Sequence, residues 1–405
     1  MTSADPTPIS TAPVSAPAPE EVVARSLGLA PRLRERIFTT EELRRLPEDT
    51  VKDAEAAGIF TMLLPRGLGG SGGDLPQAVQ VMRNLAQGDP TAAWTLGFLM
   101  CHNYLLARWP EAAQREFFKD GRPAQMAGVA NPPGRAVETE GGYLVTGRWS
   151  YCSGVMHADW VSLIAVVEGE QVPRFFLVPR GEVTVHDTWH VSGMKGSGSH
   201  DVEVGEHFVP AHLTHSVAAE FSRTSPGAAP HPETIYSYDA RDLVMLIVPI
   251  VMLGGAEGLL AGYRERLGKR RAAFSPVLTG DTTAGQMRYA QATATLRAAS
   301  ALLDDMVRRL VNANAAGPDE ISAETRAMCE LDCHTIARLT WEAAQTILQG
   351  SGSSIFRSDD ITQHYVRDLQ TLRGHATIDD DHILGKSGAL LLGRTPEVAG
   401  RLVGQ

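Results

Sequence analysis

The spacing of hydrophobic positions changes twice along the chain. Residues 20–125 carry apolar side chains at helical spacing, as in Leu75 to Leu85. Residues 126–235 instead hold short β-rich runs between closely spaced glycines and prolines: Tyr143 to Arg148, Trp160 to Val167, Arg174 to Val178 and Asp201 to Val204. Long helical patterns return over residues 236–405, notably Gly285 to Leu310 and Ser322 to Leu348. We expect an α+β fold that is mainly α, with helical domains on both sides of a small β-barrel or sandwich.

Local signals predict several helix boundaries. The glycine-rich segment Pro65 to Gly73 separates a helical pattern at Glu41 to Leu46 from the helix that follows it. Asp89-Pro90 is typical of a helix start and precedes the apolar run Thr91 to Ala107, which we expect to be buried on several sides. A last helix is predicted over His382 to Leu392.

Composition narrows the class of protein. The chain has 405 residues, of which 43% are hydrophobic and 21% charged, as in globular proteins of two or three domains. Its net charge of −10 argues against nucleic acid or an anionic membrane as a partner. Residues 1–19 are rich in Pro, Ala, Ser and Thr and predict a disordered tail. The apolar run Leu243 to Leu253 is too short for a membrane span, contains Pro249 and is interpreted as a buried helix.

Cysteine usage predicts neither a disulfide framework nor a metal site. Four cysteines in a chain of this length fit a reducing cytoplasm. Cys329, Cys333 and His334 lie close together, but they fall within a strongly helical segment and further ligands are missing. We therefore expect them to pack in the core, and we predict no metal.

One segment between two predicted strands carries candidate chemistry. Arg148 to Trp160 (RWSYCSGVMHADW) places an aromatic ring, a hydroxyl and a glycine together at Tyr151, Ser153 and Gly154. The isoalloxazine ring of a flavin is flat and apolar with polar edges, so these groups suit it. An ordinary β-hairpin is the alternative. The chain contains no phosphate-binding loop, nucleophile elbow or zinc-binding His-Glu-x-x-His motif.

The order of the segments resembles the acyl-CoA dehydrogenase family over nearly the whole chain beyond the tail. The similar stretches are PRGLGGSGG, RWSYCSGVMHADW and DTWHVSGMKGSGSHDVEVGEHFVP. The resemblance implies an N-terminal helical domain, a middle β-barrel domain and a C-terminal four-helix bundle, assembled as a homotetramer. It also implies that Ser153 reaches flavin N5, Tyr151 flanks the ring and Asn131 crosses its pyrimidine edge.

A second group of residues resembles the family's contacts to the far end of the cofactor. Arg271 and Phe274 match its R-x-x-F motif, Gln286 matches the glutamine that follows, and Gln349-Gly350 stands where the family has a glycine pair. Arg271 could instead be a solvated residue of a basic run. FAD is favoured by this motif, although FMN stays open.

His375 decides which reaction the resemblance implies. The dehydrogenases place a catalytic glutamate near this position, whereas this chain has RDLQTLRGHAT. Imidazole in its place resembles the two-component flavin-dependent monooxygenases. Those enzymes take reduced flavin (FADH2 or FMNH2) from a separate NAD(P)H-dependent reductase, form a C4a-hydroperoxyflavin with O2 and hydroxylate a small substrate, often a phenol. His375 then deprotonates the substrate or protonates oxygen; a helix-end histidine without catalytic role is the alternative.

Further pocket residues are assigned through the same resemblance. His102 matches a histidine near the substrate's polar group, although it could be a hydrogen-bonded core residue. The remaining substrate-wall candidates are Trp94, Phe98, Met156 and His157, of which His157 could only end the hairpin. The abundant Ala, Arg and Gly suggest a high-GC bacterium and, by association, secondary metabolism.

Two other functions remain open at the level of sequence. An acyl-CoA dehydrogenase or oxidase needs a carboxylate beside the flavin, and Asp379, Asp380 or Asp381 could provide a displaced base. A flavin-binding protein without catalysis is the third hypothesis. The identity of the substrate cannot be derived from these residues.

Overall fold

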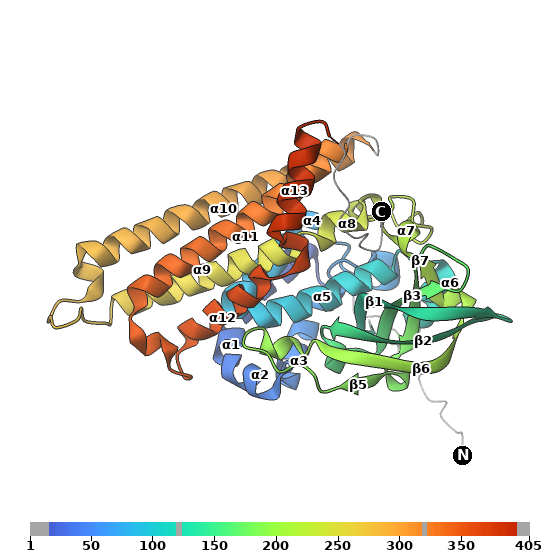
Figure 1. The fold of residues 1–405 in the computed structure, drawn as a ribbon, viewed down its shortest axis with the longest axis horizontal. Helices are drawn as coiled ribbons and strands as arrows, with labels where there is room; N and C mark the ends of the chain where they lie inside the picture. The colour runs from blue at the N-terminus through green and yellow to red at the C-terminus, as the bar shows by residue number, and fades with distance from the viewer. Residues whose placement is uncertain (1–15, 119–123, 318–321, 395–405) are drawn as a thin grey trace, which may run out of the picture.

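The structure is a computed structural model and describes residues 16–118, 124–317 and 322–394. Figure 1 shows the sheet at one end, the long C-terminal helices extending away from it, and N-terminal helices between the two. The tail predicted over residues 1–19 falls almost wholly outside the described residues.

The N-terminal helices largely follow the predicted pattern. They are α1 (Pro19–Glu35), α2 (Ile37–Leu43), α3 (Glu48–Ala57), α4 (Leu75–Gly88), α5 (Pro90–Leu106) and α6 (Glu111–Phe117). The side chain of Asp89 accepts a hydrogen bond from Thr91 N and caps α5, as the sequence predicts. The boundaries predicted for α2 are wrong. Arg44 adopts a left-handed conformation after Leu43, which lets its guanidinium bind Asp187 at 2.9 Å.

Within the described residues, all named strands belong to one sheet of order β5-β6-β2-β1-β3-β4-β7. Their bounds are β1 (Met126–Thr139), β2 (Gly142–Cys152), β3 (Trp160–Val167), β4 (Arg174–Pro179), β5 (Thr184–His186), β6 (His200–Pro210) and β7 (Thr214–Ser216). The four predicted runs lie in β2, β3, β4 and β6. β1 escaped prediction because Pro132, Pro133 and Gly134 interrupt its pattern, and its register with β3 shifts between Val129 and Gly134.

The C-terminal region contains α8 (Ala240–Val244), α9 (Ile247–Leu267), α10 (Thr283–Ala316), α11 (Ala323–Ser351), α12 (Ile361–Arg373) and α13 (Asp380–Leu391), after the short α7 (Val217–Glu220). In Figure 1 α9, α10 and α11 run side by side. The span Ala240–Leu267 is long and apolar enough to cross a membrane, but 78% of its most apolar window is buried inside the protein. That burial confirms a buried helical segment over Leu243 to Leu253, but the predicted single helix is divided by a turn between α8 and α9. α12 was not predicted.

Helices from both ends of the chain enclose the loop Gly193–Ser199, which precedes β6. A Cβ on Gly193 would lie 2.1 Å from Arg367 O of α12, and one on Gly196 would lie 2.1 Å from Thr40 of α2. No side chain fits at either position, so the two glycines allow the loop to reach the start of α5. The fold thus brings α5, α12 and this loop together beside the end of β2.

Candidate active site

The end of β2 turns sharply at the candidate flavin segment. Tyr151 and Gly154 both have positive φ, of 69° and 75°, and the register between β2 and β6 shifts between Trp149 and Cys152. A left-handed non-glycine residue is strained, and such strain is often found at functional sites. The turn buries the hydroxyl-bearing Ser153, which is 8% exposed, while the ring of Tyr151 stays 66% exposed.

The Ser153 hydroxyl lies in a network of buried polar groups. Trp94 Nε1 donates to Ser153 Oγ at 3.1 Å, and Ser199 Oγ lies 2.8 Å away on the other side. Gly154 N also donates to Ser197 O at 3.0 Å, which fixes the turn against the loop Gly193–Ser199. The position and orientation of the Ser153 hydroxyl are therefore determined by α5 and by this loop.

A row of aromatic rings joins the two predicted histidines. Trp94, Phe98 and His102 stand four residues apart on α5, so they share one helix face. Ring centroids are 4.5 Å apart for Trp94 and Phe98, 5.4 Å for Phe98 and His102, and 5.3 Å for Trp94 and His375. The structure thus places four predicted site residues in one row, with a histidine at each end.

His102 is a neutral imidazole whose Nε2 is an acceptor. Burial lowers its pKa to about 4, despite the opposing hydrogen bond to Met126 O. The contact from Nδ1 to Met126 O is 3.1 Å, and a carbonyl only accepts, so we assign the ring proton to Nδ1. Nε2 therefore carries a lone pair, close to the backbone of Gly128.

His375 has the complementary tautomer. Burial lowers its pKa to about 4, so the ring is neutral near pH 7. Thr377 N donates to His375 Nδ1 at 3.2 Å, and the Thr377 hydroxyl lies 2.9 Å from the same atom. The proton is therefore on Nε2, and His375 offers a hydrogen-bond donor where His102 offers an acceptor.

The nearby aspartates have other roles. Asp379 caps α13 by accepting from His382 N at 3.0 Å. Asp380 binds His334 at 2.8 Å and also pairs with Arg373. Both carboxylates are thus engaged in structural contacts, which weakens the hypothesis of a displaced dehydrogenase base.

The other predicted pocket residues lie at the edge of the row or have structural partners. His157 Nε2 accepts from Leu46 N at 3.2 Å, which ties the turn after β2 to the segment after α2. The ring of Tyr151 contacts Trp189 edge to face at 5.9 Å, and Met156 is partly exposed. The side chain of Asn131 lies outside the described residues.

The residues predicted for the far end of the cofactor do not reach Ser153 within one chain. Figure 1 shows the connection between α9 and α10, which contains Arg271 and Phe274, at the end of the bundle away from the sheet. Phe274 has φ 58° and a fully exposed ring. Gln286 there donates to Gly280 O at 3.1 Å, and Gln349 is exposed beside Gly350.

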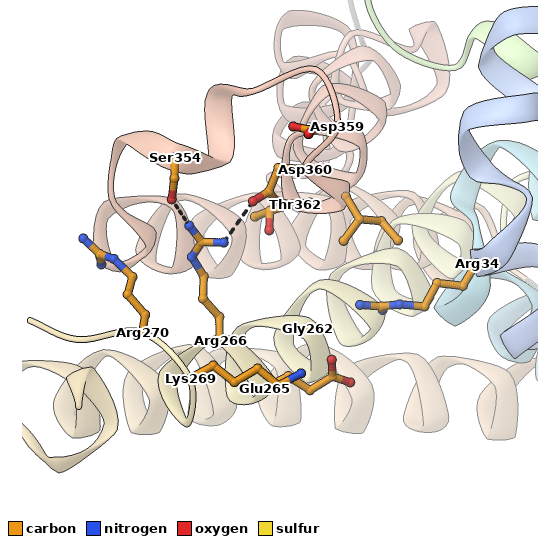
Figure 2. Close-up of a pocket in the computed structure, with 11 residues that line it drawn as sticks. Arg34, Gly262, Glu265, Arg266, Lys269, Arg270, Ser354, Asp359, Asp360 and Thr362 are labelled. Atoms are coloured by element: carbon orange, nitrogen blue, oxygen red, sulfur yellow. Dashed lines mark hydrogen bonds and ion pairs between the residues drawn. The ribbon is translucent and has the colours of Figure 1, made fainter.

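A charged cavity of about 490 Å³ lies close to these residues (Figure 2). Four cations and three carboxylates line it: Arg34, Arg266, Lys269 and Arg270, with Glu265, Asp359 and Asp360. Arg266 binds Asp360 at 2.9 Å, and Arg270 donates to Gly350 O at 3.3 Å. Gly352 has φ 74° and ψ 174°, a backbone conformation that residues with a side chain rarely adopt, so this turn beside Arg270 needs glycine.

An ionic cluster around His364, which the sequence did not predict, lies where α12 meets the start of α5. His364 of α12 binds Glu41 at 2.6 Å and lies 3.2 Å from each of Asp89 and Asp368. Burial opposes its protonation, but the three carboxylates outweigh burial and raise its pKa to about 10. Burial likewise opposes the charge of Glu41, yet His364, helped by Arg367 and Lys195, lowers the pKa of Glu41 to about 2.

This cluster holds the site's loop. Asp368 Oδ1 accepts from Met194 N at 2.6 Å, and Asp368 Oδ2 accepts from the Thr91 hydroxyl at 2.5 Å. Burial raises the pKa of Asp368, while its contact with His364 opposes that change. The His364 and Asp368 spacing of four residues was visible in the sequence, but only the fold shows that both face buried acids and a loop.

Comparisons with known proteins agree with this geometry. The family model "Acyl-CoA dehydrogenase, N-terminal domain" matches residues 28–119, and "Acyl-CoA dehydrogenase, C-terminal domain" matches residues 246–380. A pigment production hydroxylase from a Rhodococcus species is 33% identical over 364 residues, which cover 89% of this chain and 93% of that protein. The oxygenase component of an FADH2-dependent resorcinol hydroxylase from a Rhizobium species is 28% identical over 389 residues, covering 93% and 95%.

A solved structure extends the agreement to three dimensions. The HsaA monooxygenase from Mycobacterium tuberculosis superimposes with a TM-score of 0.87 at 30% identity, covering 94% of this chain and 99% of that one. The predicted fold class, the flavin and the monooxygenase reaction are thereby confirmed. The chain belongs to the two-component flavin-dependent monooxygenases built on the acyl-CoA dehydrogenase fold, and it acts as the oxygenase component that uses reduced flavin and O2.

Proposed function

We propose that the enzyme hydroxylates a small phenol that lies against the aromatic row, with His102 at one end of the row and His375 at the other. The observation that carries this proposal is the complementary pair of neutral imidazoles, an acceptor at His102 Nε2 and a donor at His375 Nε2. A phenol has an apolar ring and one hydroxyl, so it suits a row of aromatic side chains with a proton acceptor at one end. The resorcinol hydroxylase relative is named for a phenolic substrate, which supports this class.

Each residue of the site has a separate role in the proposed reaction. Reduced flavin, once bound, supplies the electrons that activate O2. Ser153 would contact flavin N5, the Nε2 of His102 would accept the hydrogen bond of the substrate hydroxyl, and the Nε2–H of His375 would donate a hydrogen bond to the oxygen being transferred. Trp94 and Phe98 exclude water from the reacting atoms, which limits the loss of oxygen as peroxide. Tyr151 flanks the ring, and Met156 lines the entrance.

We also propose a homotetramer in which the connection between α9 and α10, with the arginines of the charged cavity beside it, serves a neighbouring subunit. Arg271, Phe274, Gln286, Gln349 and Gly350 lie away from Ser153 in their own chain, so they can meet only the cofactor of a partner. Arginines and glycines suit a pyrophosphate, because the former provide forked cations and the latter allow close backbone approach (Figure 2). This arrangement favours FAD over FMN.

The relatives and the cysteines also support a proposal for the cellular setting. A separate NAD(P)H-dependent reductase supplies the reduced flavin, as the oxygenase-component relatives imply. The four cysteines are unpaired and buried, which fits a cytoplasmic enzyme. A role in secondary metabolism agrees with the relative that is named for pigment production.

Substitution of His375 tests the function directly. Reduced FAD generated by an added reductase, O2 and a panel of phenols are supplied to the wild type and to His375→Ala. We expect hydroxylated product to fall by about 10²-fold or more, the usual contribution of a positioned acid or base, while flavin affinity is kept. His382→Ala on α13 is the control. Normal hydroxylation by His375→Ala contradicts the proposed role, and bleaching of bound oxidised flavin by an acyl-CoA would support a dehydrogenase instead.

A further inference from the structure

Three buried serine hydroxyls form a chain that ends on a backbone carbonyl. Ser153 Oγ lies 2.8 Å from Ser199 Oγ, and Ser199 Oγ lies 2.7 Å from Ser197 Oγ. Ser197 in turn donates to Met194 O at 2.8 Å. All three serines are buried. Because three hydroxyls supply three protons for three contacts, a single arrangement of protons satisfies every contact.

The carbonyl fixes the direction of this chain. Met194 O has no proton, so Ser197 donates its only proton there. Ser199 must then donate to Ser197, and Ser153 must donate to Ser199. Reversing either link would leave two buried oxygens in contact without a proton between them, which is costly in the interior.

The anchor at Met194 is itself held in place. Asp368 accepts from Met194 N at 2.6 Å, and Trp189 Nε1 donates to Met194 O at 3.0 Å. His364 lies 3.2 Å from Asp368 and partly balances its charge. The position of the terminal carbonyl therefore depends on the ionic cluster below the site.

At the other end of the chain, Ser153 is left as an acceptor only. Its proton points to Ser199 and one lone pair accepts from Trp94 Nε1, so one lone pair remains. Reduced flavin carries an N–H at N5, whereas oxidised flavin has a lone pair there. We propose that Ser199 and Ser197 are positioning residues that make Ser153 an obligate acceptor, so that the site selects reduced flavin over oxidised flavin. This inference rests on the proposed placement of Ser153 at N5.

Flavin affinity in both redox states tests the inference without turnover. The apoprotein is titrated with oxidised FAD and, anaerobically, with reduced FAD. Ser199→Ala frees the Ser153 proton to donate to oxidised N5, so the preference for reduced over oxidised FAD should fall roughly fivefold, the effect of about one hydrogen bond. Ser199→Thr keeps the donor and should keep the preference. Ser197→Ala should shift it in the same direction as Ser199→Ala.

Ser225→Ala and Ser153→Ala are the controls: the first tests specificity, and the second tests the placement of Ser153 at flavin N5. Ser225→Ala removes another buried hydroxyl, one that donates to Arg108 O at 2.6 Å, and should leave the preference unchanged. An unchanged preference in Ser199→Ala, or an equal loss in Ser225→Ala, overturns the inference. If Ser153→Ala alters neither affinity, the placement at N5 fails. If Ser153→Ala alters the preference and Ser199→Ala does not, only the role of the hydroxyl chain fails.

Discussion

The imidazole of His375 meets the indole of Trp94 edge to face, with ring centroids 5.3 Å apart. His375 follows α12 near the end of the chain, whereas Trp94 belongs to α5. The same indole donates to Ser153 at the end of β2. Trp94 therefore contacts the proposed proton donor and the proposed flavin contact at once.

Replacing Trp94 by Phe should uncouple the reaction. The variant keeps an aromatic ring but loses the N–H that fills one lone pair of Ser153. We expect more peroxide and several-fold less product per reduced flavin consumed, measured by product analysis and peroxide assay. Trp149→Phe is the matched control, because its buried indole donates elsewhere, to Ile164 O at 2.8 Å. An equal effect in both variants would rule out a specific role for the Trp94 N–H.

The low pKa values of His102 and His375, both about 4, predict a pH dependence. Unfolded histidine titrates near pH 6.5, so the unfolded chain binds more protons between that pH and about 4. Stability should therefore fall as pH drops through this window, measured by urea unfolding at a series of pH values. Neither residue should produce an inflection near pH 6.5 in kcat/KM. If the wild type showed such an inflection and His375→Gln abolished it, the low pKa of His375 would be contradicted.

Asp368→Asn should destabilise the protein strongly. The substitution removes the negative charge that faces the protonated His364. Breaking a buried ion pair lowers the free energy of unfolding by about 3–5 kcal/mol. Asp359→Asn is the control, because Asp359 pairs with Arg357 at 2.8 Å on the surface, where such pairs contribute about 0–1 kcal/mol. Equal urea midpoints for the two variants would show that the cluster contributes little.

The same cluster predicts a loss of stability in alkali. The pKa of His364 is raised from 6.5 to about 10, so its contribution is complete below pH 6.5 and disappears as pH rises to about 10. Glu41, Asp89 and Asp368 face the imidazole, with Lys195 and Arg367 beside Glu41. His364→Gln should flatten this part of the stability curve, and an unchanged slope would contradict the raised pKa.

Gly128→Ala should impair substrate binding more than folding. A Cβ at this position would lie 3.0 Å from His102 Nε2, closer than most side-chain contacts. The methyl group would crowd the proposed acceptor atom, so we expect a raised KM for the phenol and little change in flavin affinity. Gly205→Ala, where a Cβ meets nothing within 4 Å, is the control. A normal KM would place the substrate away from Nε2.

Phe274→Ala tests the subunit interface. Within the part of the chain that the structure describes, the ring of Phe274 is fully exposed and its backbone is strained, so we expect the variant to bind FAD more weakly or to dissociate into smaller oligomers. Light scattering and flavin titration measure both effects. Phe38→Ala, a partly exposed phenylalanine of α2, should change neither.

Sequence reasoning succeeded where the chemistry is local. The capping residue Asp89 and the strand at Trp160 to Val167 depend on neighbours in the chain and are confirmed, whereas the role of Ser153 at the flavin stays a prediction. The residues of the row from His102 to His375 were named as separate candidates, but the row itself was not predicted, because no local pattern brings α5 and the end of α12 together. Arg44 shows the opposite case, since α2 ends before it in a left-handed conformation although the helical pattern in the sequence continues to Leu46. The cluster at His364 escaped notice because its partners come from three separate segments.

The position of the loop Gly193–Ser199 has a consequence for how the enzyme is made. Its glycines pack directly on α2 and α12, so the loop reaches its final shape only after helices from both ends of the chain have docked. Until α12 is in place, Met194 N lacks its hydrogen bond to the Asp368 carboxylate, so the loop that carries Ser197 and Ser199 is among the last parts of the site to become ordered during folding.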